Sequence, residues 1–263
     1  MERETAFCQT KQKLMDRRSS TDPPAINPLP LTITIRRVVH LSHVIDPAIP
    51  QWPGDPPVEF ETVAELEDEG YYLRRFSLGE HSATHMNAPK SFYSQGKSID
   101  QYPAESLIAK AVVIDIRKQT EANPNYVLAV SDVLAWEQQY GQISQGSVVL
   151  LFTGWQSKWS DKGAFFHQDA TGGMHFPGFG SEATQFLLKR RQIAGVGIDT
   201  HGVDSGQDTT FATNRLVLEQ PRLVVENLTN LDQLPAIGTT LVIGVLRLLG
   251  GSGSPVAVLA LLP

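Results

Sequence analysis

Two histidines that stand four residues apart, His81 and His85, are well suited to bind a metal ion, and Asn87 adds an amide two residues later. Neutral imidazole is a common ligand for zinc and other divalent ions. Two such rings on a turn after a strand can converge on one ion. Polar pairs of this kind also occur by chance at strand ends, where they bond to backbone, so the rest of the chain must decide.

The amino-acid composition excludes several classes of protein. The chain has 263 residues, 41% of them hydrophobic, and a net charge of −6. This balance argues for a globular protein and against a nucleic-acid binder. The single cysteine, Cys8, excludes an internal disulfide framework and a multi-thiolate metal site. We see no secretory signal, and the longest apolar runs are shorter than the ~20 residues of a membrane span, so we expect a cytoplasmic protein without a membrane role.

Apolar periodicity predicts the elements that position these side chains. Residues 1–30 are polar and end in a proline-rich joint, so we predict a disordered tail followed by one domain at 31–263. Helices are expected at 131–140, capped by Ser131, and at 181–191. The pattern indicates an α/β fold, a single domain with a mixed, mostly buried β-sheet flanked by helices. Strands are predicted at 31–44, 58–65, 71–78, 111–116, 147–152, 194–198, 223–225, 240–246 and 255–261.

Polar clusters follow two of the predicted buried strands. Thr153 begins one cluster and residues 199–204 form the other. Binding sites on α/β sheets lie beyond the carboxyl ends of the strands, so both clusters are plausible site rims. Trp52, in a proline-rich turn, is either a plug for the core or a wall for a flat ligand.

Several ordered segments resemble the cyclase-like metal-dependent hydrolases, the family that includes bacterial kynurenine formamidase and isatin hydrolase. The family motif H-x-G-T-H-x-D-x-P-x-H is similar to residues 81–91, and its W-P-G-D turn to residues 52–55. Residues 197–204, 225–228 and 251–255 resemble later family segments. The resemblance covers roughly residues 38–262. It implies a swivelling β/β/α fold, a divalent metal cofactor (zinc or manganese), a small-molecule substrate and a homo-oligomer, either a dimer or a tetramer.

The resemblance also assigns roles to individual positions. The family binds one or two ions through both motif histidines, the motif aspartate, a later histidine and a glutamate, and uses the last motif histidine as general base. The retained ligands are His81, His85 and Glu226. The positions that depart from the pattern are Asn87 for the aspartate, Asn214 for the later histidine and Ser91 for the base. Trp52 stands where the formamidase has a tryptophan that contacts substrate.

These departures favour one divalent ion over two. A neutral amide bridges two cations poorly, so Asn87 argues against a two-metal centre, and Asn214 removes an imidazole from the second ion. His81, His85 and Glu226 remain, a set typical of catalytic zinc sites with a water in the open position, to which Asn87 could add a weak oxygen ligand. The ion would activate water and polarise a carbonyl, so we predict hydrolysis of a C–N bond in a small amide, formamide or lactam.

The identity of the general base stays open. Ser91 cannot accept a proton at neutral pH without a base of its own. His201 is a candidate replacement, or else an ordinary loop histidine bonded to backbone, while His167 and His175 are weaker candidates. Two functions therefore remain: a hydrolase with one ion, or a catalytically impaired family member that binds small molecules or acts as a scaffold.

Overall fold

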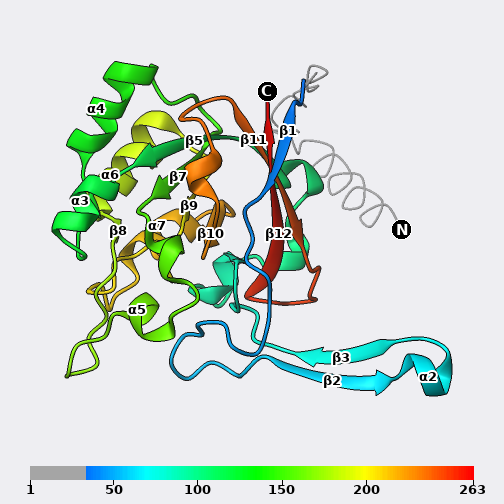
Figure 1. Cartoon of the computed structure of the whole chain (residues 1–263). Coiled ribbons are helices and arrows are strands. Elements are labelled where there is room, and N and C mark those ends of the chain that lie inside the picture. Colours follow the sequence, from blue (N-terminus) through cyan, green and yellow to red (C-terminus); the bar gives the residue numbers. More distant parts are fainter. Residues whose placement is uncertain (1–33) are drawn as a thin grey trace, which may run out of the picture. The chain divides into compact units, whose positions relative to one another are not determined.

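The computed structural model describes residues 34–263, and Thr34–Pro263 form one compact unit. The predicted tail at 1–30, Cys8, and residues 31–33 of the first predicted strand lie outside the described residues. Figure 1 shows a central sheet with helices packed on one side and a two-stranded arm that extends away from it. No helix among the described residues is long and apolar enough to cross a membrane.

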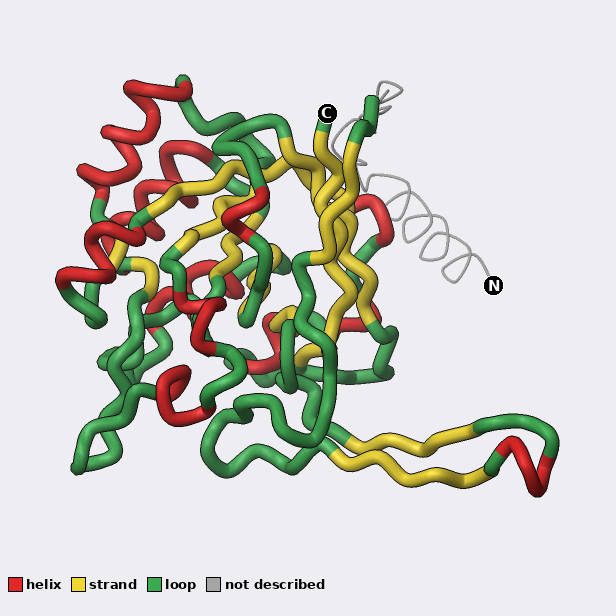
Figure 2. Tube along the Cα trace, viewed as in Figure 1, coloured by secondary structure: helices red, strands yellow, loops and turns green. Residues whose placement is uncertain are grey.

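Strands make up the centre of the domain, as Figure 2 shows. The strands are β1 (Arg37–His40), β2 (Glu59–Ala64), β3 (Leu73–Ser77), β4 (His85–Asn87), β5 (Ile108–Asp115), β6 (Val127–Leu128), β7 (Val148–Phe152), β8 (Gly178–Phe179), β9 (Gly195–Ile198), β10 (Leu223–Glu226), β11 (Thr239–Val245) and β12 (Gly253–Leu262). The α-helices are α2 (Leu66–Glu69), α3 (Arg117–Ala122), α4 (Val130–Tyr140), α5 (Lys162–Phe166), α6 (Ser181–Phe186) and α7 (Ala212–Leu218). The 3-10 turns are η1 (Pro89–Ser91), η2 (Ile99–Gln101), η3 (Ala104–Leu107), η4 (Trp155–Lys158) and η6 (Leu231–Gln233), and a π-helical turn, η5 (Leu187–Arg191), follows α6.

The main sheet closes on itself. Its strand order is β1-β12-β11-β5-β7-β9-β10-β4, and β4 also pairs with β12. Seven strands, from β12 round to β4, therefore form a closed barrel, while β1 pairs with the far end of β12. β5, β7, β9 and β10 run parallel to one another, and the other pairings in this sheet are antiparallel. The predicted α/β class and mixed sheet are confirmed, and barrel closure is the feature that the sequence did not predict.

Side chains alternate between the two faces of the buried strands and pack into two hydrophobic cores. Val113 and Leu150 point into the barrel, where side chains from β4, β5, β7, β10, β11 and β12 meet. Their neighbours Val112 and Val149 point the other way, against the layer that contains α4, α6 and α7. Strands that are covered on both faces are apolar at every position, which is why continuous apolar runs in the sequence located them.

The two predicted helices are present with different ends. Helix α4 begins at Val130, not after a Ser131 cap, because the carboxylate of Asp132 accepts the backbone N–H of Ala129 at 2.8 Å. Gly141, at φ 88°, ends α4 after Tyr140, where the predicted helix also ends. The predicted helix at 181–191 divides into α6 and the π-helical turn η5.

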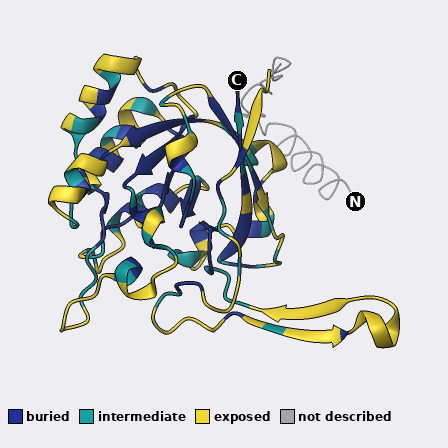
Figure 3. Ribbon diagram, viewed as in Figure 1, coloured by how far each residue is buried: buried dark blue, intermediate teal, exposed yellow. Residues whose placement is uncertain are grey.

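The arm consists of β2 and β3, the strand pair that the sequence predicted. The acidic stretch between them forms α2, which ends at Gly70 with φ 76°. Figure 3 shows the arm as mostly exposed. Large apolar side chains are exposed along it and at its tip: Val63, Leu66, Tyr71, Tyr72, Leu73 and Phe76.

Candidate metal centre and active-site pocket

One cavity of about 480 Å³ brings the predicted site residues together. Apart from the weaker base candidates His167 and His175, the residues that the sequence singled out line this cavity: Trp52, His81, His85, Asn87, Ser91, His201, Asn214 and Glu226. Aromatic and thioether side chains supply much of the remaining wall, among them Phe92, Met174, Phe176 and Phe211. The cavity lies beyond the carboxyl ends of β9 and β10, as expected for this class of sheet.

Strand β4 places the ligand motif beside Glu226. In the antiparallel pairing of β4 with β10, His85 lies opposite Glu226 and Asn87 lies opposite Val224. Because side chains alternate along a strand, His85, Asn87 and Glu226 share the face toward the cavity, while Met86 points into the barrel. The sequence placed both histidines on a turn, whereas His85 begins a strand.

The loop that carries His81 turns sharply into β4. Ala83, at the position of the family's motif glycine, has φ 53°. This left-handed conformation costs an alanine about 1–2 kcal/mol relative to the usual helical region, a cost that glycine avoids. The turn also directs the Ala83 carbonyl at His85 and holds it with the side-chain amide of Asn227 at 2.9 Å.

His85 is held with its Nε2 facing Glu226. Its Nδ1 lies 2.9 Å from the Ala83 carbonyl oxygen, which can only accept, so Nδ1 carries the proton. In the neutral ring Nε2 then carries a lone pair, and Nε2 lies 3.0 Å from Glu226 Oε2. This is the arrangement found for metal-binding histidines, whose other nitrogen is fixed by an outer hydrogen bond.

His81 is fixed in a similar way. The Ser252 hydroxyl donates to Glu80 Oε2 at 2.6 Å, so its oxygen accepts from His81 Nε2 at 2.9 Å. Burial and the neighbouring His85 lower the pKa of His81, which favours the neutral ring. Its Nδ1 lone pair then faces Asn87 Oδ1 at 2.8 Å.

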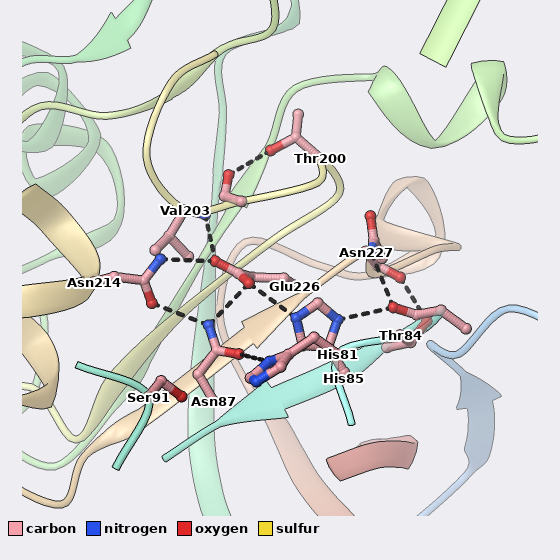
Figure 4. Close-up of polar contacts among 12 residues, drawn as sticks. His81, Thr84, His85, Asn87, Ser91, Thr200, Val203, Asn214, Glu226 and Asn227 are labelled. Carbon is pink, nitrogen blue, oxygen red and sulfur yellow. Dashed lines mark hydrogen bonds and ion pairs between the residues drawn. The ribbon is translucent and has the colours of Figure 1, made fainter. Parts of the chain in front are cut away.

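The direction of the Asn87 amide follows from its neighbours, as Figure 4 shows. Asn214 Nδ2 donates to Asp204 Oδ2 at 2.9 Å and to Glu226 Oε1 at 3.0 Å, which fixes the Asn214 oxygen on the opposite side. That oxygen accepts from Asn87 Nδ2 at 3.0 Å, and the same Asn87 nitrogen donates to Glu226 Oε2 at 2.9 Å. Asn87 Oδ1 is therefore the atom that faces His81.

These contacts fit one divalent cation. His81 Nδ1 faces Asn87 Oδ1 at 2.8 Å, and His85 Nε2 faces Glu226 Oε2 at 3.0 Å, so with both rings neutral each contact joins two lone pairs. A proton on each ring would create two buried cations with ring centroids 5.2 Å apart. One ion held by both imidazoles and both oxygens would satisfy all four atoms together.

His81, His85 and Glu226 do not by themselves form the three-ligand set that the sequence predicted. Among the described residues, no group of three or more His, Cys, Asp or Glu side chains could hold a metal ion. Burial raises the pKa of Glu226, but hydrogen bonds to its carboxylate from the Val203 N–H and Asn214 oppose burial, and its pKa is lowered overall. Glu226 is therefore a carboxylate at neutral pH. Asn214 directs its oxygen at Asn87, so its contacts fit an orienting residue rather than a ligand.

Ser91 has no partner that could make it a base. It lies at the end of η1, and its hydroxyl donates to the Ser252 carbonyl at 2.6 Å. His167 and His175 are absent from the cavity lining, and His175 is bonded instead to Asp169 at 3.0 Å.

His201 reaches the cavity but is not bonded as a loop histidine would be. Its ring is buried against Phe165 and Phe166, and Nε2 has no hydrogen-bond partner. Burial lowers the pKa of His201 to about 3. Trp52 contacts the His201 ring edge-on, with ring centroids 5.9 Å apart, and also lines the cavity, so it both packs and forms a wall.

Two supporting residues were missed from the sequence. Glu80 and Ser252 orient His81, yet one lies just before the motif and the other lies in a glycine-rich loop. The only available signal was the family-like segment at 251–255, which gave no role to its serine. The hydrogen-bonding role of Asp204 likewise depends on α7, which the sequence did not predict.

Comparison with known proteins supports the same relationship. A family model described as "Putative cyclase" matches residues 39–205. Isatin hydrolase of Roseibium aggregatum is 34% identical over 244 residues, which cover 86% of this chain and 92% of that protein. The structure of isatin hydrolase A from Ralstonia solanacearum matches with a TM-score of 0.81 and 34% identity, over 86% of this chain and 92% of that chain.

An isatin hydrolase structure with the product analogue thioisatinate bound matches over the full length of both chains. Its TM-score is 0.80 and its sequence identity is 31%, with 100% of each chain covered. The family model covers more than half of this chain, and the isatin hydrolase of Roseibium aggregatum exceeds 30% identity over most of its length. The chain belongs to the cyclase family.

Proposed function

We propose that this protein is a hydrolase that cleaves the C–N bond of a small, flat amide or lactam with the help of one divalent ion, zinc or manganese. The observation that supports the proposal is that two histidine nitrogens each face a side-chain oxygen at the cavity surface. His81, His85, Asn87 and Glu226 would hold the ion. When bound, it would lower the pKa of water and polarise a carbonyl.

The cavity supports the proposed class of substrate. Its volume of about 480 Å³ suits a small molecule, and its aromatic walls, including Trp52 and Phe176, suit a flat one. Related proteins of the family include isatin hydrolases, and one was solved with thioisatinate bound. A lactam fused to an aromatic ring is therefore the first substrate class to test.

The first test is the metal content of protein purified without a metal-affinity step. We expect about one zinc or manganese per chain, lost in both His81→Ala and Glu226→Ala, because each removes one of the proposed ligands. His40→Ala, on the exposed strand β1, is the control and should keep the ion. A wild-type protein that takes up neither metal after both are supplied would rule out the proposed mechanism.

A second candidate is a family member that binds small molecules without turnover. The orientation of Ser91 favours it, because a hydroxyl that donates to the Ser252 carbonyl cannot take a proton from water. Isothermal titration with isatin beside a sensitive hydrolysis assay separates the two candidates. Binding without hydrolysis in metal-loaded protein would favour the second.

We also propose that the protein forms a homo-oligomer through the arm. A two-stranded sheet is marginally stable in isolation, and this one carries exposed apolar side chains on both strands and its tip. A second copy of the chain would cover them. Light scattering on the purified protein gives the assembly size directly.

A further inference from the structure

His201 is enclosed by aromatic rings at the wall of the active-site pocket. It is stacked on Phe166, with ring centroids 4.7 Å apart and an interplanar angle of 15°. Phe165 meets it edge-on at 4.6 Å, Trp52 meets it edge-on at 5.9 Å, and Phe176 lies at 6.2 Å. Only 6% of the residue is exposed.

Packing alone does not explain a histidine at this position. Nε2 is buried and has no hydrogen-bond partner in the protein. A buried polar atom left unpaired costs about 1–3 kcal/mol, whereas a phenylalanine would fill a similar volume without that cost. His201 lines the pocket, but its buried Nε2 is closed to solvent, so Nδ1 is the ring nitrogen left to contact a molecule bound there.

The surroundings also define what His201 can do. Burial keeps its ring neutral, so it is poorly suited to hold a proton taken from water. A neutral imidazole retains one N–H group, which can donate a hydrogen bond without carrying charge. Glu226 and Asp204 already offer acceptors in this pocket, so a donor is the function that they do not supply.

We propose that His201 is the neutral hydrogen-bond donor for the carbonyl oxygen of the substrate, and not the general base. This inference rests on the proposed hydrolase function. As the oxygen of water bonds to the carbonyl carbon, the C=O electron pair moves onto oxygen and His201 stabilises it without transferring its proton. The C–N bond then breaks, and a proton from water ends on the leaving nitrogen.

Two substitutions separate this role from a structural one. His201→Phe keeps the aromatic packing and removes the donor, so we expect kcat to fall about 100-fold, in the range seen when one oxyanion donor is lost. The metal content and the midpoint of thermal unfolding should not fall. His201→Gln restores an N–H donor and should recover part of the lost kcat.

His43→Phe is a closely matched control. His43 is half-buried, whereas His201 is buried, but it too is stacked on an aromatic ring, Trp159 at 3.9 Å, and its Nε2 is also unpartnered. Burial lowers its pKa to about 4, but it does not line the pocket. Replacement should leave kcat unchanged.

The experiment measures metal content, isatin binding and isatin hydrolysis for the wild type and all three variants between pH 5 and 9. Equal kcat in wild type and His201→Phe would overturn the role of His201 and leave the hydrolase proposal intact. If the pH dependence of wild-type kcat shows an ionisation near pH 6–7 and His201→Phe lacks it, His201 would instead be the base. Metal-loaded wild type that neither binds nor hydrolyses isatin, formamides or other lactams would overturn both proposals.

Discussion

The amide of Asn87 is the residue-level feature that most affects the chemistry of the site. Its Oδ1 faces His81, and its Nδ2 donates hydrogen bonds to Glu226 and Asn214. A carboxylate in its place would have no N–H to give to Glu226. The single-atom difference between an amide and a carboxylate therefore controls both the charge and the hydrogen bonding of the centre.

Asn87→Asp should bind divalent ions more tightly and be less stable without them. The new carboxylate adds one negative charge near the ion, but without the ion it faces Glu226 at close range. We expect an affinity gain of about tenfold, measured by titrating chelator-treated protein with zinc or manganese. The control is Asn123→Asp, at an exposed position. Unchanged affinity would place Asn87 outside the ligand set.

Asn214→Leu tests the orienting role of the second amide. The variant removes the contacts that fix Asn87 and one oxygen of Glu226, without removing a proposed ligand. Outer contacts of this type usually change metal affinity by about 10- to 100-fold, so we expect a loss of that size. Complete loss, equal to that of Glu226→Ala, would instead indicate that Asn214 contacts the ion directly.

At the scale of elements, strand β12 passes very close to the ligand loop. A Cβ added at Gly253 would lie 2.6 Å from His81 Cε1 and 2.9 Å from the Met86 carbonyl oxygen. The glycine is needed for space, since side chains other than hydrogen would displace the imidazole. A Cβ added at Gly244, on the neighbouring strand β11, would have its nearest contact at 3.4 Å.

Gly253→Ala should therefore disturb the proposed metal centre far more than Gly244→Ala. We expect the first variant to lose about 1–3 kcal/mol of stability through overpacking and to bind the ion at least tenfold more weakly. Urea unfolding and metal titration measure the two effects. Equal behaviour of the two variants would show that β12 can move away from His81 at little cost.

The lengths of the strands and helices also explain which of them could be predicted from the sequence. The buried strands β7, β9 and β10 were located because every position in them is apolar or glycine, apart from Glu226 at the end of β10. Strand β4 has three residues, two of them polar, so no periodicity marks it. Helix α7, with Asn214, has seven residues and follows Phe211 at φ 56°, without a side-chain cap. The gathering of these side chains in one pocket was therefore predictable from the motifs, whereas the amide orientations were not.

At the scale of the whole molecule, Asp199 couples stability to pH. Burial raises its pKa to about 6, although Thr153 donates to it through both its backbone N–H, at 2.9 Å, and its hydroxyl, at 2.7 Å. The folded state therefore binds a proton more tightly than the unfolded state, whose aspartate pKa is about 3.9. Its contribution is greatest at low pH and falls as the pH rises from about 4 to 6.

Asp199→Asn should flatten this part of the stability profile. Asparagine keeps the oxygen that accepts both Thr153 donors and cannot ionise. A shift of about two pKa units corresponds to about 3 kcal/mol, so the stability difference between variant and wild type should change by up to that amount between pH 4 and 7. Urea unfolding of both proteins across this range measures it. A constant difference would mean that Asp199 has an ordinary pKa when folded.

Because β4 closes the barrel and carries site residues, hydrogen exchange at its backbone amides should respond to changes in the site. This short strand is the seam between β10 and β12, and it carries His85 and Asn87. Its flanking amides are part of the seam, since Val256 N–H donates to the Thr84 carbonyl at 3.0 Å and Ala88 N–H to the Ser252 carbonyl at 2.8 Å. An ion that ties β4 to Glu226 would hold this seam shut. Hydrogen–deuterium exchange at residues 85–88 should therefore slow on metal addition, while the remote arm exchanges as before.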